Sequence, residues 1–88
     1  MNVEFHPHAR ERLAERGALE AEVVAAVLGG EQFAAKLGRT GFRRNFSYGG
    51  TWRGRQYASK QVEAYAVRQG DDWLVITVIV KYFGEEEA

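Results

Sequence analysis

The chain of 88 residues has no cysteine and a single proline. Without cysteine it can form neither a disulfide nor a thiolate metal site, and it has no thiol nucleophile. Long apolar runs are also missing, because the longest, at residues 73–80, spans eight positions, whereas a membrane helix needs roughly 20. Residues 1–7 contain neither a basic segment nor a long apolar one, so no secretion signal is expected. These absences predict a cytoplasmic protein that does not enter a membrane.

A net charge is missing too, because 12 basic and 12 acidic residues cancel. The charges are nevertheless unevenly distributed along the chain. Residues 32–62 contain seven basic and no acidic residues, and the other 57 residues contain five basic and twelve acidic ones. The same stretch holds six aromatic residues, and basic residues interleaved with aromatic ones suit phosphates and unstacked bases. The alternative is a solvated basic hairpin whose aromatic side chains belong to the core.

The first part of the chain has the apolar spacing of helices. The length allows one domain, which we expect over residues 1–84, with an acidic tail at 85–88. Apolar residues recur every four positions before Gly17 and again over residues 19–28, which predicts two helices. Pro7 suits the first turn of the first helix, and Gly17 suits its C-terminal cap. The second helix begins at Leu19, which cannot provide a side-chain cap.

After Gly30 the apolar period changes from four to two. Strands are expected at about residues 42–48, 55–68 and 73–83, with a further short one at 31–37. Turns are expected at Gly49-Gly50 and at residues 69–72. The even positions of the last strand form an apolar face. The order predicts an α+β fold in which two N-terminal helices pack on one face of a three- to four-stranded antiparallel sheet.

The sequence contains few motifs for catalysis. Ser47 and Ser59 lie in no nucleophile motif, and no glycine pattern for phosphates or dinucleotides is present. His6 and His8 are two positions apart at a helix start, which does not place them on one helix face. We therefore expect no metal and no cofactor.

Metal-independent cleavage of RNA needs only proton-transfer groups and cations. His8 would be the acid or base because its ordinary pKa is near neutral pH. Arg12, one helical turn later, would hold the phosphate. The alternative is an exposed His8 and an Arg12 that pairs with a nearby carboxylate such as Glu15. Candidate nucleic-acid-binding cations are Arg16, Arg43, Arg44, Arg53, Arg55, Lys60 and Lys81.

The opening segment resembles a known family. The matching residues are His8, Ala9, Arg12, Leu13, Arg16 and Gly17, together with the Val-Ile-Thr-Val segment at 75–78. This pattern is similar to that of the small bacterial domains of unknown function called DUF4258. That family has been grouped by fold similarity with RelE-like and colicin-like ribonuclease toxins. The resemblance implies a toxin-type endoribonuclease that uses His8, Arg12 and Arg16, and it assigns no strand residue.

Three functions therefore stay open from the sequence. The first is an enzyme of the toxin type that cleaves RNA. The second is a non-catalytic module whose basic surface binds RNA or an acidic, antitoxin-like protein. The third is a structural homodimer in which the strand at residues 73–83 pairs across the two subunits.

Overall fold

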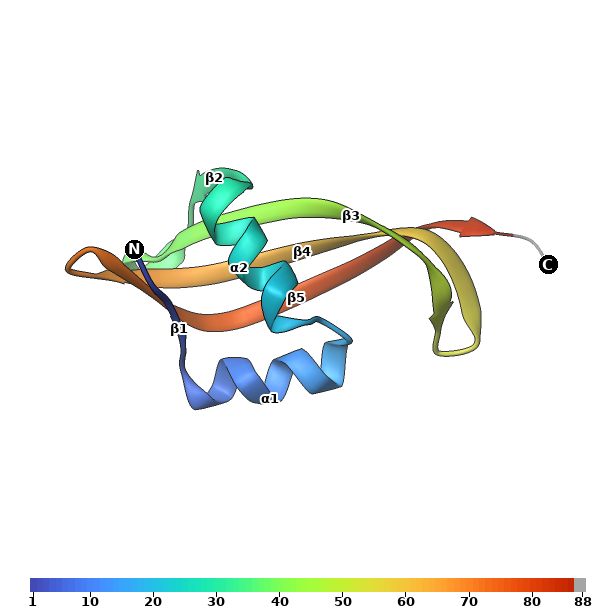
Figure 1. Cartoon of the computed structure of the whole chain (residues 1–88), viewed down its shortest axis with the longest axis horizontal. Helices are drawn as coiled ribbons and strands as arrows, with labels where there is room; N and C mark the ends of the chain where they lie inside the picture. Colours follow the sequence, from blue (N-terminus) through green and yellow to red (C-terminus); the bar gives the residue numbers. More distant parts are fainter. Residues whose placement is uncertain (87–88) are drawn as a thin grey trace.

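The computed structural model describes residues 1–86 and shows an α+β fold, which confirms the predicted class (Figure 1). In chain order the elements are β1 (Val3–Phe5), α1 (Pro7–Arg16), α2 (Glu20–Gly29), β2 (Glu31–Ala34), the 3-10 helix η1 (Lys36–Gly38), β3 (Thr40–Trp52), β4 (Arg55–Gln69) and β5 (Asp72–Glu86). The strands form one sheet in the order β1-β5-β4-β3-β2. β1 is parallel to β5, and the other neighbours are antiparallel. The sequence did not indicate β1, because three residues are too few to show an alternating pattern.

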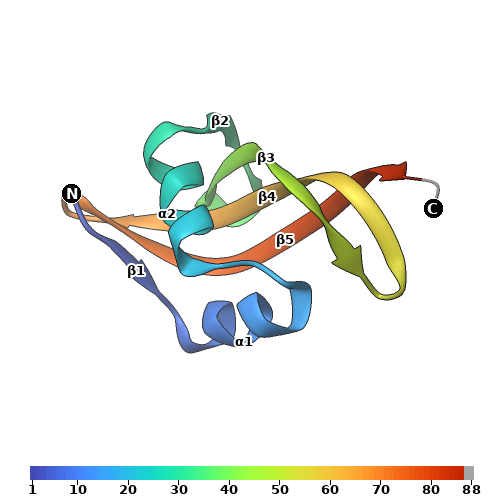
Figure 2. The same cartoon turned by 45° about the vertical axis from the view of Figure 1, so that its right-hand side comes forward.

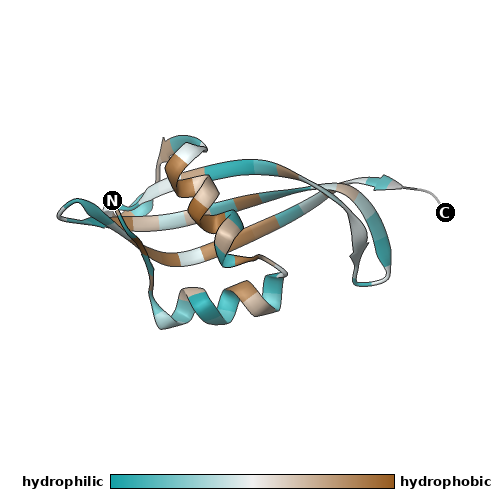
Figure 3. Ribbon diagram, viewed as in Figure 1, coloured by the Kyte–Doolittle hydropathy of each residue, from teal (hydrophilic) through white to brown (hydrophobic). Residues whose placement is uncertain are grey.

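Both helices lie on the same face of the sheet (Figure 1, Figure 2). α1 packs against β5, and α2 packs against β3 and β4. α2 is largely hydrophobic, whereas hydrophilic residues predominate on α1 (Figure 3). The largest fully buried side chains of this core are Val23, Val62, Val75 and Val78. Over residues 1–86, no helix combines the length and the apolar character needed to cross a membrane.

The helix ends follow from their cap residues. The Nδ1 atom of His6 accepts a hydrogen bond from the backbone N–H of His8 at 3.1 Å, which caps α1. Gly17 ends α1 in the left-handed conformation with φ 73°, as predicted. Leu19 provides no side-chain cap for α2, also as predicted. The Oε1 atom of Glu22 instead accepts a hydrogen bond from the backbone N–H of Leu19 at 2.9 Å.

The prediction of a turn at Gly49-Gly50 is wrong. Both glycines lie inside β3, where the pairing with β4 shifts between Ser47 and Gly50. Such a β-bulge favours glycine at positive φ, and Gly49 has φ 60°. The hairpin turns instead at Arg53 and Gly54, with φ of 51° and 83°. Positive φ at both central residues is typical of the tight two-residue turns that join antiparallel strands.

The expected apolar face of β5 is wrong for the first half of the strand. Trp73 and Val75, at odd positions, are buried with exposures of 8% and 0%. The pairing of β5 with β4 then skips Ile76. Beyond this point the buried residue is Val78, at an even position. A bulge moves every later side chain to the other face of the sheet, so no single alternation describes the whole strand.

The expected acidic tail at residues 85–88 is partly strand. Glu85 and Glu86 belong to β5 and pair with β4. Residues 87–88 lie outside the part of the chain that the structure describes. The sheet therefore extends beyond the domain boundary expected at residue 84.

Candidate nucleic-acid interface

Three of the predicted site residues form a stripe along α1, which we call the α1 stripe: His8, Arg12 and Arg16. They lie on successive turns, about 6 Å apart along the helix axis. The side chain of His8 is 70% exposed, and its Nδ1 atom lies 3.9 Å from Oε2 of Glu11. Its ring stacks on that of His6, with the ring centroids 5.3 Å apart. Both contacts of the His8 ring thus involve residues of α1 or its cap.

Arg12 pairs with a neighbour on the same helix. Its Nη1 atom lies 2.8 Å from Oε2 of Glu15, and its side chain is 35% exposed. This is the alternative role that the sequence left open for Arg12. An exposed pair of this kind contributes at most about 1 kcal/mol, so a phosphate could displace the carboxylate. Arg12 is therefore a secondary cation beside any anion bound near α1.

Arg43 and Lys81 lie on the sheet face that neither helix covers. Arg43 follows the buried Phe42 in β3, and its guanidinium lies over the Phe33 ring at 4.1 Å from the ring centroid. The Nζ atom of Lys81 lies 3.2 Å from Oε1 of Glu63 on the neighbouring strand. The sheet itself therefore separates these two cations from the α1 stripe.

Arg44 and Arg55 contact elements other than α1. The Nη1 atom of Arg44 donates to the backbone oxygen of Ala25 in α2 at 3.3 Å. The Nη1 atom of Arg55 lies 3.5 Å from Oε2 of Glu85 in β5, and the Arg55 side chain is 66% exposed. The structure thus does not bring either side chain together with His8 and the rest of the α1 stripe.

Lys60 is an interior residue with 4% of its surface exposed. Its Nζ atom lies 2.8 Å from Oε1 of Glu22 and donates to the backbone oxygen of Gly17 at 3.0 Å. The same ammonium group lies 5.2 Å from the centroid of the Tyr48 ring. The structure therefore places Lys60 beneath the link between α1 and α2, where its charge is neutralised, and not at the surface of the cleft.

Arg16 and Arg53 are the two candidates that come together. They line a cleft of about 400 Å³ between the end of α1 and the β3–β4 hairpin. The hairpin extends past the helices and curves to the side on which α1 lies (Figure 1, Figure 2). The Nη1 atom of Arg16 donates to the backbone oxygen of Val78, which holds its guanidinium against β5. The other residues that line the cleft are Trp52, Ile79, Val80 and Tyr82.

An aromatic stack forms one wall of this cleft. The rings of Trp52 and Tyr82 are nearly parallel, with an angle of 16° and centroids 5.0 Å apart. Tyr48 and Tyr57 pack around the Tyr82 ring at centroid distances of 5.2 and 5.6 Å. The Arg53 guanidinium lies over the Trp52 ring, 5.4 Å from its centroid. The cleft thus combines a cation with an aromatic surface.

The hydroxyl of Tyr82 connects the stack to α1. It donates to the backbone oxygen of Arg16 at 2.9 Å. Burial, followed by the neighbouring Tyr48 and Glu22, raises the pKa of Tyr82 to about 12. The hydroxyl therefore keeps its proton and its hydrogen bond at neutral pH.

Gly17 allows the stack to approach the end of α1. A Cβ atom at this position would lie 2.6 Å from Cζ3 of Trp52 and would also overlap the Tyr82 hydroxyl. The backbone φ of 73° favours glycine for a separate reason. The residue that ends the helix is thus also the residue that leaves room for one wall of the cleft.

Sequence reasoning found the cations of the cleft but not its aromatic wall. The sequence does point to Trp52, because this residue precedes Arg53 in the basic stretch that is rich in aromatic residues. The sequence does not point to Tyr82, because its even position in the last strand places it on the expected apolar face. Its position beside Trp52 depends on the curvature of the hairpin, which spacing in the sequence does not show.

Comparison of the chain with protein-family models, curated proteins and solved structures gives no match. The resemblance of residues 8–17 to DUF4258 therefore stays a prediction. Among the side chains of residues 1–85, no cluster of three or more acidic or histidine residues is placed to hold a metal ion.

Proposed function

We propose that this protein binds single-stranded RNA in the cleft between α1 and the β3–β4 hairpin. The observation that carries the proposal is the position of two guanidinium groups, Arg16 and Arg53, around the Trp52–Tyr82 stack. Single-stranded nucleic acids are held by cations that contact the phosphates and by aromatic rings that stack on the bases. The two kinds of group come from segments far apart in the chain and meet at one cleft.

The contacts suggest how a nucleotide would be held. Arg53 is an exposed turn residue whose guanidinium covers Trp52. A base that stacks on Trp52 would replace that guanidinium, which would then be free to bind the adjacent phosphate. Arg16 would bind a second phosphate with the N–H groups that do not donate to Val78. Arg12, one turn away, would extend the cationic path along α1.

Binding is favoured over cleavage by the position of His8. It lies two helical turns from Arg16, about 12 Å along the axis, and the contacts of its ring are with Glu11 and His6. An acid–base group must reach the proton that it transfers, and the phosphate cations must lie beside it. The ribonuclease function implied by the resemblance is therefore the alternative, and RNA cleavage would be its signature.

Fluorescence anisotropy with a labelled single-stranded RNA of about 12 nucleotides tests the proposal. We expect Arg16→Gln and Arg53→Gln each to weaken binding and each to reduce the slope of log K against log salt by about 0.7. Trp52→Ala should weaken binding about 5- to 150-fold, because stacking contributes about 1–3 kcal/mol per base.

Arg39→Gln is the matched control, because it removes the same charge from the opposite face of the sheet. It should leave both the affinity for RNA and its salt dependence nearly unchanged. The proposed interface is wrong if the three cleft variants bind RNA as the wild type does. It is also wrong if Arg39→Gln weakens binding as much as the cleft variants do.

A further inference from the structure

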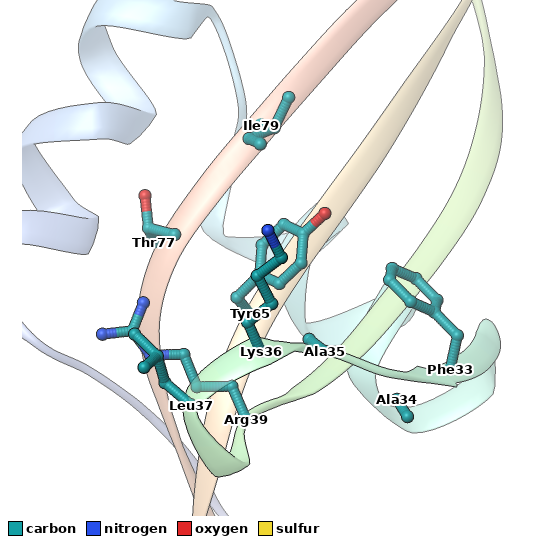
Figure 4. A pocket seen from close by; sticks show the side chains of 9 residues that line it. All are labelled: Phe33, Ala34, Ala35, Lys36, Leu37, Arg39, Tyr65, Thr77 and Ile79. Carbon is teal, nitrogen blue, oxygen red and sulfur yellow. The ribbon is translucent and has the colours of Figure 1, made fainter.

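The open face of the sheet has a second groove, which shares Ile79 with the cleft and is otherwise lined by different residues. One wall is the segment at residues 33–39, which includes η1, and the floor is formed by Tyr65, Thr77 and Ile79 of β4 and β5 (Figure 4). Its volume is about 600 Å³. Sites for small ligands are usually about 300–1,000 Å³, with a mostly apolar lining and a few polar groups. This groove has the size and the lining of such a site.

Two cations of the wall have no partner within the described chain. Lys36 and Arg39 both line the groove, and no carboxylate among residues 1–85 lies within ion-pair distance of either. In Figure 4 both side chains extend from the loop together with that of Leu37. The wall thus presents positive charge beside an apolar floor.

The negative charge nearest the floor is compensated. Glu63 is 4% exposed, and its Oε1 atom lies 3.2 Å from Nζ of Lys81. Its other oxygen accepts a hydrogen bond from the Tyr65 hydroxyl at 3.3 Å. Burial and then Glu63 raise the pKa of Tyr65, so this hydroxyl stays neutral. The groove therefore presents a net positive charge to a ligand.

Leu37 is held in an unusual conformation above this groove. Its φ of 62° lies in the left-handed region, and it is 84% exposed, the highest exposure among the large hydrophobic residues. Left-handed backbone at a residue other than glycine costs about 1–3 kcal/mol and occurs often where a ligand is bound. An exposed leucine at the rim of a mostly apolar groove would gain burial when a ligand lies beneath it.

We propose that this groove binds a small amphipathic anion. Its apolar body would lie on Tyr65 and Ile79 beneath Leu37, and its carboxylate, sulfonate or phosphate would be held by Lys36 and Arg39. Charge complementarity favours this occupant over a second copy of the chain. Two open faces packed together would bring the unpaired Lys36 and Arg39 of one copy near those of the other.

The fluorescent probe 1-anilinonaphthalene-8-sulfonate, with an apolar ring system and one anionic group, tests the proposal on the whole chain. We expect saturable binding to the folded wild type and at least a tenfold weaker affinity in Lys36→Gln/Arg39→Gln. Arg10→Gln, which removes an exposed charge from α1 outside both the groove and the cleft, should bind the probe as the wild type does. Octanoate should displace the probe, and the neutral octanol should not.

Three results would overturn the proposal. The first is equal displacement by octanol, which would show a merely apolar surface. The second is unchanged probe binding in the double variant. The third is displacement by an acidic peptide but not by octanoate, which would identify a protein partner instead. Retained RNA binding in the double variant would show that the groove and the cleft are independent sites.

Discussion

Lys60 Nζ lies 2.8 Å from Glu22 Oε1, and this ion pair joins β4 to α2 in the interior of the protein. The two side chains are only 5% and 15% exposed. The same ammonium donates to the backbone oxygen of Gly17, and the same carboxylate accepts from the backbone N–H of Leu19. The pair therefore fixes the link between the two helices, and with it the end of α1 that borders the cleft.

Removing one member of this pair should destabilise the fold. Lys60→Met leaves the Glu22 carboxylate buried without its cation, which we expect to cost about 3–5 kcal/mol of unfolding free energy. The double variant Lys60→Met/Glu22→Gln should recover most of that loss, because it removes both charges and keeps an oxygen for Leu19. Urea unfolding measures the unfolding free energy of the single and of the double variant. A loss below about 1 kcal/mol in the single variant would contradict an essential interior pair.

Gly17→Ala should destabilise the protein by about 2–4 kcal/mol, as judged by urea unfolding. The left-handed backbone costs about 1–2 kcal/mol for alanine, and the new methyl group would collide with Trp52 and Tyr82. Gly70→Ala is the matched control, because Gly70 also has positive φ, 60°, but no atom lies within 4 Å of the added Cβ. Equal losses in the two variants would show that the stack does not rest on Gly17.

The stability of the protein should fall as the pH rises above about 10. Burial raises the pKa of Tyr82 from 10.0 to about 12, so the unfolded chain loses this proton at a lower pH than the folded one. Ionisation therefore favours the unfolded state between these two values. Tyr82→Phe should have a shallower decline in unfolding free energy between pH 10 and about pH 12. Parallel curves for the two proteins would contradict a buried hydroxyl.

His8→Ala should leave the affinity for RNA nearly unchanged, and Arg12→Ala should lower it only slightly. His8 contacts residues of α1 and its cap, and Arg12 already pairs with Glu15. Wild-type protein incubated with labelled RNA without metal should leave the strand intact on a denaturing gel. Cleavage by the wild type that is lost in His8→Ala would instead establish the ribonuclease alternative.

The local patterns of the sequence predicted most of the fold. Pro7 and Gly17 delimit α1 as expected, because capping depends on the residue itself and its close neighbours. The prediction of a turn at Gly49-Gly50 was wrong because glycine at positive φ is favoured in a β-bulge as well as in a hairpin turn. The prediction of one apolar face along β5 was wrong because Ile76, the residue that the pairing skips, is an apolar residue like its neighbours.

The site was predicted less well than the fold, because it depends on contacts between distant segments. Lys60 has the sequence context of a surface cation in a basic stretch, and only the position of Glu22 on α2 makes it an interior residue. Tyr82 lies beside Trp52 because the hairpin curves, which a residue pattern cannot show. Arg53 is a candidate from the sequence only as a cation of the basic stretch, and its position at the tip of the hairpin follows from the turn at Arg53 and Gly54.

The indole N–H resonances of the two tryptophans report directly on whether RNA occupies the cleft. Trp52 lines the cleft, and Trp73 is buried in the core with 8% exposure. Titration with single-stranded oligouridine, followed by NMR and assigned with Trp52→Phe, should shift the Trp52 resonance and leave that of Trp73 in place. Binding of the RNA without a change at Trp52 would contradict binding in the cleft, because the strand would then lie elsewhere on the protein.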